Sequence, residues 1–264
     1  VISGNSLIIP SGRAVPASFN KNTGEYQYYR IQEFQKTGGS FVAATDNLFF
    51  NHYREKLVSI YDTNTGLGLL SQIGRFPIID GNVIYISKEG TVSAHDIAGI
   101  EALAKKGPPK VTEELKKEPL APEYTPFYIG YMPETVDEKG FQNQALAIWE
   151  KSQLWTISAD ATGDLIKAGN YLYAADGNSI TAIDLSKEKP FIAWIITVGG
   201  PVERLLAANG KLFAVTVDGR ILAFGGEKVK PNRILDRAIA AGANLAATKE
   251  ALSIIEKSGV SEGY

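Results

Sequence analysis

The chain of 264 residues contains no cysteine. Disulfide bonds, thiolate metal sites and a cysteine nucleophile are therefore excluded for this sequence. The same absence leaves the compartment open, because a protein without cysteine is compatible with reducing and with oxidising surroundings. The sequence starts at Val1, without an initiator methionine and already inside a repeat, as a processed product or an excised piece would. Of the possible locations, a periplasmic or exported one is favoured.

The sequence also lacks an excess of basic residues and long apolar runs. The net charge is −2 and the pI about 5.8, which leaves no excess of cations to neutralise phosphates. No apolar run approaches the roughly eighteen residues that cross a bilayer. A hydrophobic content of 44% with 21% charged residues is that of a folded globular protein. We therefore expect a protein or small-ligand partner, with no nucleic acid and no membrane span.

Five segments share one pattern, a tight turn rich in Gly and Asn followed by an apolar strand. Aligned on one apolar residue each, they are separated by steps of 41, 35, 89 and 40 residues. The aligned residues are Leu7, Leu48, Val83, Leu172 and Leu212. A unit of about 40 residues built of short strands is typical of the four-stranded blades of a β-propeller. We expect the five aligned residues to occupy equivalent buried positions.

Each repeat contains a second strand after a hairpin turn. These segments alternate in character and cover residues 17–20, 58–62, 92–96, 180–184 and 221–224. The turns before them are Ser11-Gly12, Glu89-Gly90, Asp176-Gly177-Asn178 and Asp218-Gly219. Such turns supply the positive φ that a tight hairpin requires. The predicted fold is all-β, a β-propeller with at least five blades in residues 1–225.

The step of 89 residues, about twice the length of the others, contains an insertion at about residues 97–150. Its paired charges and prolines predict a solvated, partly flexible excursion that is most sensitive to proteases at residues 100–120. Beyond the excursion, Ala145–Trp149 and Leu154–Ile157 are expected to be strands. The insertion then lies within or between blades and has room for one degenerate blade.

Residues 226–264 differ in composition from the repeats. The stretch from Arg233 to Ser258 is rich in Ala, Leu, Ile, Glu and Lys and is followed by Gly259. This composition with a glycine stop predicts a helix. We expect a short helical connector towards a domain that this sequence does not contain.

Two repeats continue into a turn of fixed chemistry, Asn20–Gly24 and Asp62–Gly66. An amide or acid can cap such a turn, and its glycine takes the left-handed conformation. Residues Ala17 to Gly24 resemble the docking motif of the quinoprotein-like (PQQ-like repeat) β-propeller family, Ala-x-Asp-x-x-Thr-Gly-x-x-x-Trp, with Asn20 in the place of the acid and Tyr28 in that of the tryptophan. The resemblance covers about residues 1–225. It implies that the aromatic residue packs between blades.

Two functions implied by the resemblance can be compared with the residues present. Quinoprotein dehydrogenases of the family hold a quinone and calcium with a Trp, a vicinal Cys pair and carboxylates, but this chain has no Cys and no local acid cluster. We expect no cofactor, and we expect Trp149, Trp155 and Trp194 to pack between blades. The last residues, 259–264, resemble the lead-in to a class I methyltransferase domain, which follows such propellers in some bacterial proteins. The glycine-rich methyl-donor loop is absent here.

One polar cluster is a candidate ligand-contacting surface. Arg13 and the run His52, Tyr53 and Arg54 follow corresponding strands of adjacent repeats and should emerge on the same face, where they could bind an anion or a sugar. The alternative is ordinary hairpin chemistry with solvated charges. His52 and His95 are the only histidines, which are too few for a transition-metal site.

No catalytic constellation is visible. There is no Gly-x-Ser-x-Gly elbow, and neither histidine has an obvious Ser and Asp partner in the sequence. We therefore predict a non-catalytic recognition or assembly scaffold, an inference that depends on fold analogy. The main alternative is the propeller part of an enzyme whose methyl transfer lies in a downstream domain. A quinone-dependent dehydrogenase is the less favoured one.

Overall fold

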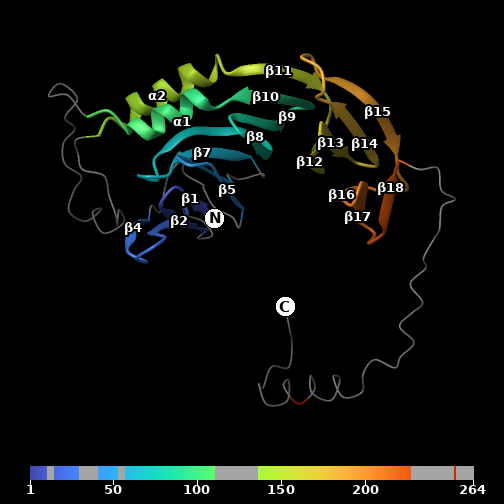
Figure 1. Ribbon diagram of the computed structural model, residues 1–264, viewed down its shortest axis with the longest axis horizontal. Helices are drawn as coiled ribbons and strands as arrows, with labels where there is room; N and C mark the ends of the chain where they lie inside the picture. Colours follow the sequence, from blue (N-terminus) through green and yellow to red (C-terminus); the bar gives the residue numbers. More distant parts are fainter. Residues whose placement is uncertain (11–14, 30–40, 53–56, 111–135, 227–252, 254–264) are drawn as a thin grey trace. The chain divides into compact units, whose positions relative to one another are not determined.

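The computed structural model describes residues 1–10, 15–29, 41–52, 57–110, 136–226 and 253. The chain divides into two compact units, Val1–Gly225 and Gly226–Tyr264. The described part of the first unit is built almost entirely of antiparallel strands that pair in chain order (Figure 1). The expected helix from Arg233 to Ser258 falls outside the described residues, apart from Ser253.

Four hydrogen-bonded sheets follow one another along the first unit. The first contains β1 to β4, at Ile2–Ser3, Ser6–Ile9, Ala17–Asn20 and Tyr26–Tyr28. The second contains β5 to β11, at Val42–Ala44, Leu48–His52, Val58–Asp62, Gly68–Asp80, Val83–Lys88, Thr91–Asp96 and Gln153–Ser158. The third contains β12 to β15, at Asp164–Ala168, Tyr171–Asp176, Ser179–Asp184 and Phe191–Thr197. The fourth contains β16 to β18, at Val202–Ala208, Lys211–Thr216 and Ile221–Gly225.

The seven-stranded sheet is two blades joined through one long strand. The first half of β8 pairs with β7, and its second half, from Arg75, pairs with β9. Gln72 and Phe76, on either side of this changeover, have φ of 54° and 49°, so the strand bends where it passes from one blade to the next. Gly74 lies at the bend, where a Cβ would come within 3.0 Å of the Ile86 Cβ. The chain thus forms five blades of a β-propeller, as predicted.

Each blade has two apolar faces because its side chains alternate. We call the face towards the preceding blade the leading face and the face towards the following blade the trailing face. Four apolar cores fill the junctions between blades, each combining a trailing face with the next leading face. Representative contributors, in chain order, are Ile8 with Phe49, Phe50 with Ile84, Tyr85 with Leu172, and Ala175 with Leu212.

The strand pairing corrects the sequence alignment by one residue in two blades. Leu48 and Val83 pair with Asp62 and Asp96, whereas the residue that pairs with Asp184 is Tyr171 and not Leu172. The equivalent positions are therefore Leu7, Phe49, Ile84, Leu172 and Leu212. A slip of one residue moves a strand side chain to the opposite face. Leu48 accordingly packs on the trailing side of its blade.

The insertion is helical and lies within the third blade, between β10 and β11. Helices α1 (Ala98–Lys106) and α2 (Glu138–Trp149) pack on each other, and α2 packs on β8 (Figure 1). Ile100 and Phe141 are fully buried in the core between the second and third blades. The expected strand at Ala145–Trp149 is therefore wrong, as is a solvated excursion over 98–106, because apolar residues at helical spacing face the sheet. The strand at Leu154–Ile157 is confirmed as β11.

The turns confirm the predicted docking of one blade on the next. Asn20 Oδ1 accepts hydrogen bonds from the amides of Asn22 and Thr23 at 2.9 and 3.2 Å. The Tyr28 ring is 2% exposed, and its hydroxyl donates to the carbonyl of Thr63 in the second blade at 2.8 Å. Tyr28 therefore packs between the first and second blades, as expected. Of the predicted hairpin turns, Ser11-Gly12 lies outside the described residues.

Candidate functional site: a groove beside helix α2 and an exposed edge strand

The predicted polar cluster lies largely outside the described residues. Arg13, Tyr53 and Arg54 belong to segments that the structure does not describe. His52 ends β6 and is half-buried, and its ring stacks on Phe41 with 5.0 Å between centroids and 18° between planes. The grouping of these four residues therefore stays a prediction.

A groove of about 440 Å³ lies between the second and third blades beside α2. Its apolar lining includes Leu70 of β8 and Ile86 of β9, and α2 contributes Leu146 and Trp149. Its polar lining includes Lys88, Glu89, Ser93, His95 and Thr156. The groove exists because the insertion places a helix over a blade face that carries hydroxyl and imidazole groups. Sequence reasoning missed it, since Ser93 and His95 share a face with α2 residues more than 50 positions away.

His95 is the most constrained polar residue of this groove. Its Nε2 lies 3.1 Å from Ser93 Oγ, and its Nδ1 lies 3.0 Å from Ser152 Oγ. Ser152 Oγ donates its one proton to the carbonyl of Trp149 at 2.7 Å, so it can only accept from His95. The neutral ring therefore carries its proton on Nδ1, and its Nε2 accepts from Ser93. The ring also stacks on Trp149, with centroids 4.1 Å apart and planes 4° apart.

This environment keeps the imidazole neutral. His95 is 7% exposed, and burial lowers its pKa from 6.5 to about 4. A Ser–His pair used for nucleophilic catalysis needs a base that accepts a proton readily and a third group that stabilises the resulting cation. Here the third group is the hydroxyl of Ser152. Among the described residues, no carboxylate is hydrogen-bonded to His95. The arrangement suits a neutral hydrogen-bonding wall better than a general base.

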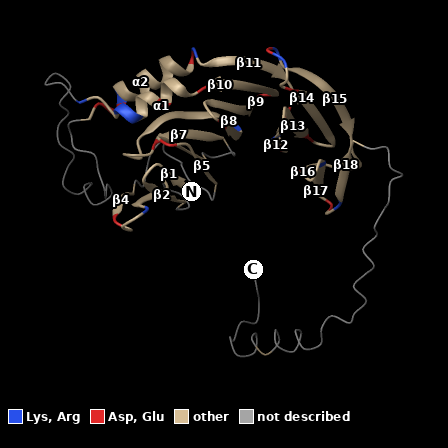
Figure 2. Ribbon diagram, viewed as in Figure 1, with Lys and Arg blue, Asp and Glu red and all other residues tan. Residues whose placement is uncertain are grey.

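The outer strand of the fourth blade, β15, presents an unusual apolar surface. Its four exposed large apolar side chains are Phe191, Ile192, Trp194 and Ile195, which are 38%, 39%, 37% and 58% exposed. The strand contains no charged residue, and its ribbon is free of blue and red in Figure 2. Trp194 contacts Tyr173, with 5.7 Å between ring centroids. It was expected to pack between blades, but its side chain remains exposed. Trp155, in contrast, packs at the junction of the third and fourth blades.

The backbone of β15 is also available on one side. In the described part of its sheet it pairs with β14 alone, so its opposite edge is unpaired. The pairing skips one residue, because Ile183 faces Ile192 while Ala182 faces Trp194. From Trp194 to Thr197 the pairing is regular. Two other outer strands, β4 and β11, each expose one large apolar side chain, Tyr26 and Leu154.

Two negative findings apply to the described residues. They contain no group of three or more His, Cys, Asp or Glu side chains placed to hold a metal ion. Within the same ranges, no helix is long and apolar enough to cross a membrane.

Comparison with known proteins yields similarity to solved structures only. No family model matches the sequence, and no curated protein sequence matches it. A chain of the mitotic checkpoint complex is 12% identical with a TM-score of 0.48, over 84% of this chain and 60% of that one. Hsv2 of Kluyvelomyces marxianus is 10% identical with a TM-score of 0.48, over 87% and 59%. The designed protein Ika8 is 12% identical with a TM-score of 0.41, over 85% and 69%. This chain thus spans about 60% of the first two structures, and at such identities the likeness concerns the fold alone.

Proposed function

We propose that the chain is a non-catalytic β-propeller scaffold that binds protein partners by strand addition at β15. The observation that carries the proposal is β15 itself, an uncharged seven-residue strand with four exposed large apolar side chains and one edge that no described strand pairs with. Edge strands of this kind are normally shortened, charged or covered, because they template pairing with other chains. An edge left apolar and open is the surface that an extended peptide recognises by β-augmentation.

The incoming segment is an extended chain with alternating apolar residues. Its backbone pairs with the regular stretch Trp194–Thr197, and its side chains contact Trp194 on one face and Ile195 on the other. The groove supports the non-catalytic part of the proposal, because its histidine is neutral and the group hydrogen-bonded to the Nδ1 of that histidine is the hydroxyl of Ser152 and not a carboxylate.

The test uses a random twelve-residue peptide library displayed on phage and selected on the immobilised chain. Selected peptides are then titrated by calorimetry against the wild type, Ile195→Lys and the control Leu154→Lys. Leu154 is a matched control because it is 55% exposed on another outer strand, against 58% for Ile195. We expect Ile195→Lys to weaken binding at least tenfold and Leu154→Lys to leave it unchanged. Hydrogen exchange should show slowed β15 amides in the complex.

Two outcomes would reject the proposal. One is a selection that enriches no peptide. The other is a set of peptides that bind Ile195→Lys as tightly as the wild type. Circular dichroism of both variants establishes that the fold is intact before the affinities are compared.

A further inference from the structure

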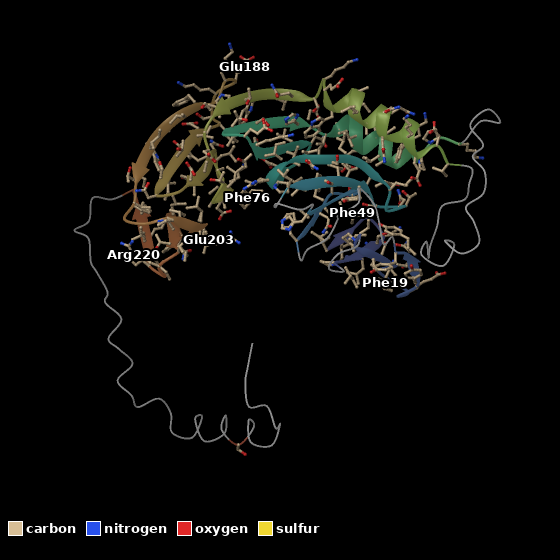
Figure 3. All side chains as sticks on the ribbon, turned by 180° about the vertical axis from the view of Figure 1, so that it is seen from behind. Phe19, Phe49, Phe76, Glu188, Glu203 and Arg220 are labelled. Carbon is tan, nitrogen blue, oxygen red and sulfur yellow. The ribbon has the colours of Figure 1, made fainter. Side chains whose placement is uncertain are left out.

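The first and fifth blades each have one apolar face that no blade of the described chain covers. The first blade's open leading face consists of Ile2, Leu7, Ile9, Phe19 and Tyr26, which the strand pairing places on one side of the sheet. The fifth blade's open trailing face consists of Leu206, Phe213, Val215, Ile221 and Ala223. Figure 3 labels Phe19 of the open leading face and Phe49 of a covered one.

At the first internal junction, the positions equivalent to Leu7 and Phe19 are fully buried. Tyr61 pairs with Phe49 in the second blade as Phe19 pairs with Leu7 in the first, and Tyr61 and Phe49 are 0% exposed. On the open leading face, Ile2 is 60% exposed and Tyr26 is 41% exposed. On the open trailing face, Leu206 is 61% exposed and Ile221 is 70% exposed. Several large apolar side chains side by side on one surface are characteristic of an interaction face.

The four internal junctions show what covers such faces. At every junction a trailing face packs on a leading face, and the two open faces are one of each kind. In the first junction the leading face contributes the stacked pair Phe49 and Tyr61, with centroids 4.9 Å apart, and the trailing face contributes Ile8. The open leading face offers the aromatic pair Phe19 and Tyr26, with centroids 5.8 Å apart, and the open trailing face offers the exposed aliphatic residues Leu206 and Ile221.

We propose that a second copy of this chain covers these faces, with the open trailing face of one copy packed on the open leading face of the next. The contact is heterologous, because two different surfaces meet, and such contacts continue into rings or filaments. Two charged residues have strand positions on the open trailing face, Arg204 and Lys211, and Glu203 is 3.9 Å from the Arg204 guanidinium. The strands of the open leading face contain no charged residue. No like-charge repulsion opposes the contact. The association uses blade faces and is independent of partner binding at β15.

Single-face variants and their mixture test the proposal. Tyr26→Glu disables the leading face and Leu206→Glu the trailing face, and Leu154→Glu is the matched control away from both. We expect light scattering after gel filtration to give the wild type and the control a mass well above the 28.5 kDa of one chain. Each single-face variant should be monomeric. Mixing the two variants should restore one junction and give a species of twice the single-chain mass.

Each alternative arrangement has its own result, and each would overturn the proposal. A monomeric wild type at 100 μM shows that copies do not cover the faces. If the full chain is monomeric but the chain without residues 226–264 assembles, the chain's own C-terminal segment is the occupant. Assembly of Tyr26→Glu or Leu206→Glu alone indicates a symmetric contact between like faces. Ile221→Glu repeats the trailing-face test at a more exposed position, should Leu206→Glu lose its circular dichroism signal.

Discussion

Replacing His95 by glutamine should flatten the pH dependence of the chain's stability between pH 7.5 and pH 5. In the folded chain burial lowers the His95 pKa to about 4, whereas an unperturbed histidine titrates near 6.5. Between these two values the unfolded chain binds a proton that the folded chain excludes. The free energy of unfolding therefore falls as the pH is lowered through this window, and the loss is complete near pH 4.

The size of the effect follows from the two pKa values. Complete exclusion of the proton removes roughly 3 kcal/mol from the free energy of unfolding, and about 2 kcal/mol of this is already lost at pH 5. Burial raises the pKa of the carboxyl groups of Asp62 and Asp164. Those carboxyl groups are present in both proteins, so their contributions cancel when the variant is compared with the wild type.

Urea unfolding followed by circular dichroism at pH 7.5 and pH 5 measures the effect. We expect the wild type to lose about 2 kcal/mol more than His95→Gln over this interval. His52→Gln serves as the control and should keep the larger part of the wild-type slope. Equal losses in the wild type and His95→Gln would refute the reasoning, because His95 would then titrate normally in the folded chain.

Three further substitutions, two of them with a matched control, test how the blades and the insertion are held together, and all are measured by urea unfolding at pH 7.5. Gly24 and Gly66 have φ of 72° and 70°, but only at Gly66 would a Cβ meet another side chain, the Tyr28 ring at 2.6 Å. Gly24→Ala should cost about 1 kcal/mol and Gly66→Ala at least about 1 kcal/mol more, and equal costs would contradict the close packing. Tyr28→Phe should cost about 1 kcal/mol through the lost hydrogen bond, and no loss would mean that water replaces it. Phe141→Ala should cost about 3–5 kcal/mol and the exposed Leu146→Ala less than about 1 kcal/mol, unless the helical insertion is not docked on the blades.

The strands and turns were readable because they depend on local chemistry. Asp-Gly, Glu-Gly and Asn-Gly turns need positive φ, and alternation of apolar and polar residues selects a strand, so the all-β fold and its second strands could be predicted. The docking turn could be predicted as well, since Asn20 and Tyr28 stand where the resembled motif has an acid and a tryptophan, at a spacing that places them in one blade. These signals lie within a few residues of each other.

The side of the sheet on which a residue lies was harder to predict. Leu48 and Leu172 both follow similar turns, but Leu48 is the first residue of its strand and Leu172 is the second residue of its own. They therefore face opposite neighbouring blades. The helix at Ala145–Trp149 was mistaken for a strand, because a short apolar run has no period of its own and only contact with β8 selects the helix. Its docking in turn creates the His95 groove.

The sequence alone specifies blades, because each blade is a local unit of turns and alternating strands. Only the tertiary structure shows which apolar faces are covered, since burial depends on what packs against a sheet and not on the sheet's own residues. Phe49 and Phe19 are both aromatic residues in apolar strands. One is fully buried between blades, and the other lies on a face that no described blade covers. The exposed strand β15 differs from a core strand for the same physical reason.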